Sequence, residues 1–184
     1  MFVGSGANGK STLLELLETF IGKQNASHVT LQALCDHRFA AAELCLKLIN
    51  TCADIPHKNL FKTGTFKELT GGDMIQAERK FKSFFYFRNY AKLLFSCNAV
   101  PESTDDSLAW FRRWIIIECP NQFTGDKEKP RIIDSLTTPQ ELSGTLNWAL
   151  EGLTRLLNKK RFTNQLEIAQ QRQNHIEQSN SCQA

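Results

Sequence analysis

The 184-residue sequence predicts an α/β fold with a central parallel sheet flanked by helices. The first observation is a glycine-rich, phosphate-binding motif directly before a helical pattern. The second is a set of three short apolar runs, at 44–53, 91–97 and 114–119, two of which end at a polar residue. The third is a strongly amphipathic helix pattern near the carboxyl end. Apolar runs that alternate with helical patterns are typical of parallel sheets.

The motif occupies residues 4–12, which read GSGANGKST and fill every fixed position of the P-loop pattern G-x-x-x-x-G-K-[ST]. Its glycines let backbone N–H groups turn toward a phosphate, and the following helix adds the positive end of its dipole. Lys10 is expected to reach the β- and γ-phosphates of ATP, and the Ser11 hydroxyl to hold Mg²⁺. The alternative is a glycine-rich turn before a helix. The predicted ATP-binding residues are Gly4, Ser5, Gly6, Ala7, Asn8, Gly9, Lys10, Ser11 and Thr12.

The context of this motif is a predicted helix on one side and a short strand on the other. The helical spacing of apolar residues over 13–21 predicts a helix that ends at Gly22. Only Met1–Val3 precede Gly4, whereas a buried strand usually has about five residues. We therefore expect an upstream segment that completes the strand and carries another domain.

Composition narrows the class of protein. With 41% hydrophobic residues, the chain is suited to one compact domain. No apolar run approaches a membrane span and the amino end lacks a secretory pattern, so we expect a cytoplasmic protein without a membrane partner. The six cysteines form no C-x-x-C pair, which favours reduced thiols over a zinc site. Net charge is only +3, but residues 58–92 are locally basic, either as a solvated surface or as a nucleic-acid site.

Two of the apolar runs deliver polar side chains to their carboxyl ends. Asp54 follows the run 44–53, and Asn98 follows the run 91–97. Ligands in open α/β sheets bind outside the carboxyl ends of the strands. Asp54 is therefore predicted to be a second Mg²⁺ partner, and Asn98 to orient an attacking water. The alternative for both residues is a simple role in a turn.

The third apolar run follows a pair of arginines, Arg112 and Arg113. One of them is a candidate arginine finger, which stabilises charge on a transferred phosphoryl group and is often supplied by a neighbouring subunit. The alternative is surface pairing with acidic residues, for which Asp105, Asp106 and Glu118 are available.

The carboxyl end contains a predicted helix and a polar tail. Thr138 and Glu141 form a capping box with Pro139 at the first helical position. Leucines then recur on one face until the basic residues at 159–161. Residues 163–184 are rich in Gln, Asn and Ser, so we expect a frayed helix or disorder there and place the boundary of the domain at residue 162.

Taken in order, these segments resemble the superfamily III helicases, and more closely the helicase module of phage, plasmid, archaeal and poxvirus primase-helicases. The resemblance covers residues 1 to about 162. It rests on the segments 4–12, KLINTCADIP at 47–56, FKELTGGDMIQAERKFK at 66–82, AKLLFSCNAVP at 91–101, WFRRWIII at 110–117, and 136–157.

The resemblance implies a P-loop NTPase fold of the AAA+-like kind with a C-terminal helical segment, in an ATP-dependent DNA helicase or translocase. Lys10 and Ser11 would be the Walker A pair, Asp54 the Walker B acid and Asn98 the sensor. Arg112 or Arg113 would reach the ATP of the next subunit in a homo-oligomeric ring, a hexamer, that acts in replication of a virus, phage or plasmid. A loop over Lys67 and 71–82 would face single-stranded DNA, with cations that hold its phosphates. The expected DNA-binding residues are Lys67, Arg79, Lys80 and Lys82.

Several alternatives stay open from the sequence. No second acid follows Asp54, so the general base is unassigned among Glu43, Glu68 and Asp73. The aromatic residues at 81 and 84–87 are expected to pack in the core rather than to stack on bases. Rival functions are a remnant that binds nucleotide or DNA without turnover, and a small P-loop kinase.

Overall fold

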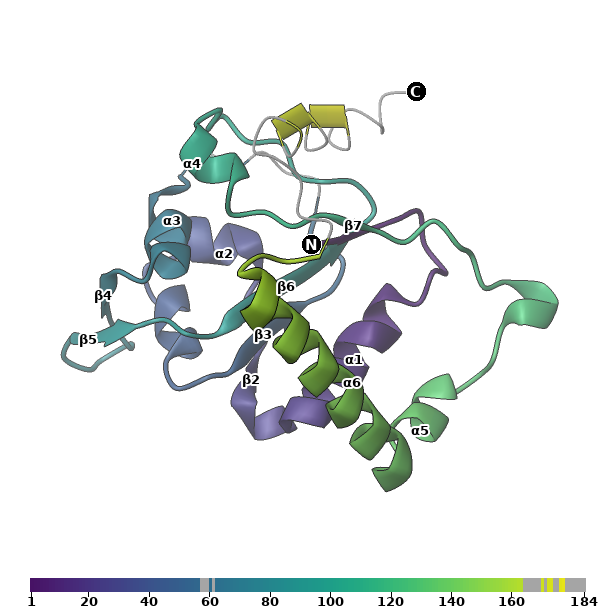
Figure 1. Cartoon of the computed structure of the whole chain (residues 1–184). Helices are drawn as coiled ribbons and strands as arrows, with labels where there is room; N and C mark the ends of the chain where they lie inside the picture. Colours follow the sequence, from purple (N-terminus) through teal and green to yellow (C-terminus); the bar gives the residue numbers. More distant parts are fainter. Residues whose placement is uncertain (57–59, 61, 164–169, 171, 174–175, 178–184) are drawn as a thin grey trace.

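A computed structural model describes residues 1–56, 60, 62–163, 170, 172–173 and 176–177. Its centre is a five-stranded parallel sheet with the strand order β2-β3-β6-β1-β7. A separate antiparallel hairpin of β4 (Met74–Ala77) and β5 (Phe85–Arg88) projects to one side (Figure 1). The sheet and its flanking helices confirm the predicted α/β class. Most of the predicted tail at 163–184 lies outside the described residues. Within the described part of the chain, no helix is long and apolar enough to span a membrane.

The shortest predicted strand lies inside the sheet rather than at an edge. β1 pairs with β6 on one side and β7 on the other, so that Phe2 lies opposite Ser96 and Ile117. Both residues of β1 are buried. The strands of the sheet are β1 (Phe2–Val3), β2 (Ala26–Ser27), β3 (Ile49–Cys52), β6 (Lys92–Cys97) and β7 (Ile117–Glu118).

Chain direction places the helices on the two faces. In the strand order, the chain first moves from β1 to the edge strand β2. It then moves back in the opposite direction, from β2 to β3 and on to β6. Because parallel crossovers are right-handed, α1 lies on one face and α2 and α3 on the other. The α-helices are α1 (Lys10–Ile21), α2 (Leu31–Asp36), α3 (Gly64–Gly71), α4 (Leu108–Phe111), α5 (Ile132–Leu136) and α6 (Pro139–Lys159). Short 3₁₀ turns are η1 (Lys23–Asn25), η2 (Ala40–Leu44) and η3 (Gly125–Lys127).

The main core lies between the sheet and the helices α2, α3 and α4. Phe66 of α3 stacks on Trp114 with ring centroids 4.8 Å apart, and Trp110 meets Trp114 edge-on at 5.2 Å. Phe95 of β6 is fully buried beneath them. On the other face, α1 packs against β3 and β6 and buries Leu14 rather than Leu13, which is 37% exposed.

The basic segment forms a hairpin where a loop was expected. β4 (Met74–Ala77) and β5 (Phe85–Arg88) pair antiparallel, with Gln76 opposite Tyr86. Ile75 and Ala77 point inward and are buried, whereas Met74 and Tyr86 are exposed. Alternation of this kind anchors one face of the hairpin to the domain and leaves the other in solvent.

Helix α6 has the predicted boundaries but little packing. The Thr138 hydroxyl accepts the Glu141 amide at 3.3 Å, as the capping box predicts. None of its residues is buried, and Leu146, Leu150 and Leu153 are each about half exposed. The helix crosses in front of the sheet in Figure 1 and meets α5 at its amino end.

Candidate active site

The glycine-rich loop between β1 and α1 is shaped by backbone conformations that favour glycine. Gly6 and Gly9 have φ of 102° and 78°, and Ala7 between them has φ of 48°. A Cβ on Gly4 would lie 2.1 Å from Asn8 Nδ2 and 2.5 Å from the Cys119 carbonyl oxygen. A side chain at position 4 is therefore excluded by two neighbours that the loop needs.

Lys10 is held inside this loop. Its Nζ donates to the Gly4 carbonyl at 2.7 Å and to Asn8 Oδ1 at 2.8 Å, and the residue is only 5% exposed. Asn8 Nδ2 in turn donates to the Cys119 carbonyl at 3.0 Å, which ties the loop to the end of β7. The ammonium group thus occupies a prearranged position at the head of α1, where it can attract an anion.

Asp54 and Asn98 lie at the same edge of the sheet as this loop. The Gly4 amide donates to the Cys97 carbonyl at 3.2 Å, so the exposed Asn98 follows directly beside the start of the loop. Ser96 holds the Asp54 turn, because its Oγ accepts the Asp54 amide at 3.3 Å and its carbonyl accepts the Ile55 amide at 3.0 Å. Asp54 has φ of 51° and an exposed carboxylate. The carboxyl ends of β1, β3 and β6 therefore bring together the glycine-rich loop, Asp54 and Asn98.

One cavity beside the loop contains acidic side chains that the sequence reasoning missed. It has a volume of about 390 Å³ and is lined by Ser11, Glu15 and Glu18 of α1 together with residues of β3. The Thr51 hydroxyl donates to Glu18, and His28 Nδ1 lies 3.6 Å from the same carboxylate oxygen. Residues i, i+4 and i+7 share one face of a helix, so this grouping could have been found from the sequence.

A larger cavity of about 770 Å³ lies on the other side of α1. The Phe123 amide donates to the Ala7 carbonyl at 2.7 Å, which brings the segment after β7 over the loop. The lining combines apolar side chains with the backbone of the loop. It comprises Ala7, Asn8, Gly9, Thr12, Leu13, Leu16, Phe123, Lys127, Glu128, Lys129, Ile132 and Leu136.

The three general-base candidates lie outside both cavities. Glu43 is exposed in η2, Glu68 is exposed on α3, and Asp73 lies just before β4. The acids that share a cavity with Ser11 are Glu15 and Glu18.

The two adjacent arginines have different environments. The Arg113 guanidinium donates from Nε to Thr70 Oγ1 at 3.0 Å, from Nη2 to the Lys67 carbonyl at 3.2 Å, and from Nη1 to the Ala109 carbonyl. Burial, together with the charge of Arg112, lowers the pKa of Arg113. Arg112, in contrast, is exposed at the end of α4. Arg113 therefore joins α3 to α4, and Arg112 is placed where a second molecule could meet it.

The basic residues predicted for DNA fall into two groups. Arg79, Lys80 and Lys82 are exposed in the turn of the β4-β5 hairpin. Lys67 instead lies on α3 and forms an ion pair with Asp105 at 2.7 Å. Burial raises the pKa of Asp105, but hydrogen bonds from Lys67, Ser107 and Thr63 outweigh it and hold that pKa well below its usual range. Lys67 is thus part of the scaffold beneath α4.

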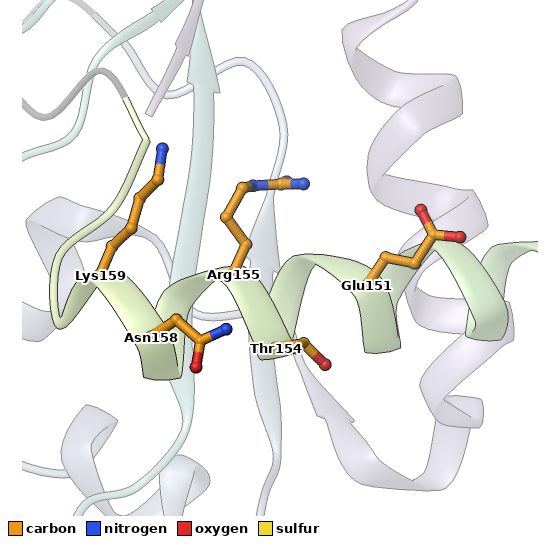
Figure 2. A pocket seen from close by; sticks show the side chains of 5 residues that line it. All are labelled: Glu151, Thr154, Arg155, Asn158 and Lys159. Atoms are coloured by element: carbon orange, nitrogen blue, oxygen red, sulfur yellow. The ribbon is translucent and has the colours of Figure 1, made fainter.

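A third hollow, shown in Figure 2, lies along α6 and is lined by Glu151, Thr154, Arg155, Asn158 and Lys159. All five side chains come from this one helix. A hollow with a single helix as its wall cannot surround a ligand, so we do not treat it as a site.

Two properties of the described residues concern their thiols and their possible metal ligands. Cys35, Cys45, Cys52, Cys97 and Cys119 form no disulfide with one another. Within the same part of the chain, no group of three or more His, Cys, Asp or Glu side chains is arranged to hold a metal ion. Mg²⁺ in nucleotide sites usually takes one or two carboxylate ligands from a protein and the rest from phosphates and water.

The chain belongs to the protein family DUF5906, whose model, described as a family of unknown function, matches residues 2–113. It is similar to the "Putative helicase L207/L206" of Acanthamoeba polyphaga mimivirus, with 33% identity over 134 residues. That match covers 70% of this chain and 14% of the mimivirus protein, so the chain spans about one seventh of its relative.

Solved structures of the NrS-1 C terminal region share the fold. One matches with a TM-score of 0.59 and 21% identity, over 77% of this chain and 34% of its own. Another covers 98% of this chain and 42% of its own, with a TM-score of 0.52 and 21% identity.

Proposed function

We propose that this chain is the ATPase motor domain of a DNA helicase or translocase of the superfamily III, primase-helicase type. The observation that carries the proposal is the gathering of the glycine-rich loop, Asp54 and Asn98 at one edge of the sheet. The helicase name of the mimivirus relative supports the same class. Action in the replication of a virus, phage or plasmid, a hexameric ring and a cytoplasmic location are parts of this proposal.

In the proposed site, the triphosphate of ATP lies against the backbone of residues 4–12. Lys10 leaves its present partners, Gly4 and Asn8, and neutralises the β- and γ-phosphates. Asn8 remains bonded to Cys119 and keeps the loop open. The nucleobase enters the larger cavity, where the Phe123 ring and the apolar side of α1 exclude water from one of its faces.

Mg²⁺ fits the oxygen ligands that this edge offers. The Ser11 hydroxyl and the Asp54 carboxylate are both exposed, and Mg²⁺ is commonly bound by one or two protein oxygens plus phosphates. Bound there, the ion would neutralise charge on the phosphates. Asn98 would orient the attacking water.

Arg112 is the proposed arginine finger. It is exposed, whereas the bonds of Arg113 to three partners would have to break before that side chain could reach another subunit. Arg112 would thus act on the ATP of the adjacent subunit in a ring.

The β4-β5 hairpin is the proposed contact with single-stranded DNA. Its turn carries three exposed cations, and its inward face is anchored by Ile75 and Ala77. Hydrolysis at the sheet edge would move this hairpin along the strand. Lys67 has no part in the contact in this proposal, because Asp105 engages it.

The test is phosphate release by the 184-residue chain with and without an oligo-dT. Turnover that single-stranded DNA stimulates is the expected result. Unstimulated phosphate transfer to a small acceptor would instead indicate a kinase. Binding of ATP without any turnover would indicate a remnant, and either of these results would overturn the motor proposal.

A further inference from the structure

The turn of the hairpin carries a large aromatic side chain that the fold does not use. Phe81 is 92% exposed, and the Lys82 amide donates to the Arg79 carbonyl at 2.9 Å across this turn. Burial of an aromatic ring is one of the strongest stabilising contributions to a core. Phe81 makes almost no such contribution.

Local conformation does not explain Phe81 either. Its φ is 63°, in the left-handed region that bulky residues rarely adopt and that glycine adopts freely. A glycine would satisfy this turn with less strain. A residue that opposes both packing and local preference is a candidate for a functional contact.

The neighbours of Phe81 define the chemistry that would recognise it. Lys80 Nζ lies 4.9 Å from the centre of its ring, and Lys82 follows it in the turn. Phe84 and Tyr86, on the outward face of the hairpin, are 62% and 64% exposed. Exposed rings among cations match the alternation of bases and phosphates in a single strand of nucleic acid. A duplex hides the faces of its bases, so it offers this turn much less.

We propose that Phe81 stacks on a base of single-stranded DNA while Lys80 and Lys82 hold the phosphates beside that base. This inference rests on the proposed function of the hairpin and names the residue that makes contact with bases. Stacking has little dependence on sequence, because every base has a flat aromatic face. The hairpin would therefore bind single-stranded DNA of any sequence.

The first experiment measures binding of a fluorescent oligo-dT to the full chain by anisotropy, over a series of salt concentrations. Phe81→Ala and Phe81→Gly should each weaken binding about 5- to 100-fold. Neither should change the slope of log affinity against log salt. Lys80→Ala should reduce that slope by about 0.7. Trp148→Ala, which removes an exposed ring on α6, is the matched control and should bind like the unchanged chain.

Thermal unfolding separates stacking from loss of structure. Phe81→Gly should unfold at the same temperature as the unchanged chain or higher, because glycine removes the strained conformation. Phe81→Trp should bind oligo-dT like the unchanged chain, because it keeps an aromatic ring at this position. The oligo-dT should quench the fluorescence of the added tryptophan. Weaker oligo-dT binding by Phe81→Gly at an unchanged melting temperature would thus identify Phe81 as a contact residue.

Two results would overturn the proposal, and they are distinguishable. Phe81 variants that bind like the unchanged chain, while Lys80→Ala binds more weakly, would remove the stacking contact and leave the DNA-binding hairpin intact. Failure of the unchanged chain to bind oligo-dT at low salt would remove the DNA contact of the proposed function as well.

Discussion

The carboxyl edge of the sheet and the turn of the β4-β5 hairpin differ in how their cations are held. At the sheet edge, Lys10 is 5% exposed and bonded to two oxygens of its own loop. At the hairpin turn, Arg79, Lys80 and Lys82 are all exposed. The first arrangement suits a reaction that needs fixed geometry. The second suits a strand of DNA that must be bound and released. Variants of the two regions should therefore fail in different ways.

The largest expected effect concerns Arg112. Arg112→Ala should lower phosphate release about 1000-fold, because a finger supplied in trans is worth that much or more in related chemistry. Its unfolding midpoint should be unchanged. Arg113→Ala should instead lower the free energy of unfolding by about 1–3 kcal/mol, since it removes the hydrogen bonds of the guanidinium to Thr70 and to two carbonyls. Phosphate release and urea unfolding of both variants provide the measurement.

Mixing subunits sharpens this prediction. Asp54→Asn and Arg112→Ala chains, each inactive alone, should regain partial turnover when mixed, because some interfaces then combine an intact acid with an intact arginine. No recovery, together with a lowered unfolding midpoint for Arg112→Ala, would assign that arginine to the scaffold.

Removal of Lys10 should have the next largest effect. Lys10→Ala should lower phosphate release about 100-fold or more, by analogy with loss of a single charge-stabilising donor. It should leave oligo-dT binding to the hairpin unchanged. Lys159→Ala, an exposed lysine on α6, serves as the control and should retain full turnover. Turnover that survives Lys10→Ala would mean that the loop is not the catalytic site.

Loss of Ser96 should have a smaller effect on the same edge. Ser96→Ala removes the hydroxyl that accepts the Asp54 amide but keeps the carbonyl that accepts Ile55. We expect a loss of about tenfold in turnover, corresponding to about 1.4 kcal/mol for one hydrogen bond. Added Mg²⁺ should recover part of the loss if Asp54 has only shifted. A variant that is fully active at all Mg²⁺ concentrations would contradict the assigned role of Ser96.

The last expected effect is on stability rather than on turnover, and it depends on pH. The pKa of Asp105 is lower in the folded chain than in the unfolded one, where it is about 3.9. Its contribution to the free energy of unfolding is therefore complete above about pH 5 and is lost as the pH falls below 4. Asp105→Asn should be less stable by about 1–3 kcal/mol at pH 7, and the difference should shrink toward pH 3. A difference that is constant from pH 7 to pH 3 would contradict this account.

The features that could be predicted from the sequence are those that depend on residues close together in the chain. The loop at 4–12, the end of α1 at Gly22, and the capping box of α6 each depend on a few adjacent residues. Asp54 and Asn98 were placed at one edge because the carboxyl ends of parallel strands coincide. These predictions required no knowledge of which strands are neighbours.

Contacts between distant segments were beyond this reasoning. Ser96 supports Asp54 across 42 residues, and Arg113 bonds to Thr70 across 43. No pattern in the sequence distinguishes Arg112 from Arg113, because only the position of α3 does so. The aromatic residues at 81 and 84–87 were expected in the core. Alternation along β5 instead leaves Phe85 and Phe87 half-buried and exposes Tyr86, and Phe81 and Phe84 are exposed in the turn that precedes β5.

The central claim, that the sheet edge and the hairpin are two parts of one motor, is tested most directly by coupling. The measurement is the ratio of phosphate release with and without oligo-dT for the unchanged chain and for a Lys80→Ala, Lys82→Ala double variant. We predict a ratio well above one for the unchanged chain and near one for the variant, with equal rates in the absence of DNA. A ratio of one for the unchanged chain, or equal stimulation of both, would contradict the account.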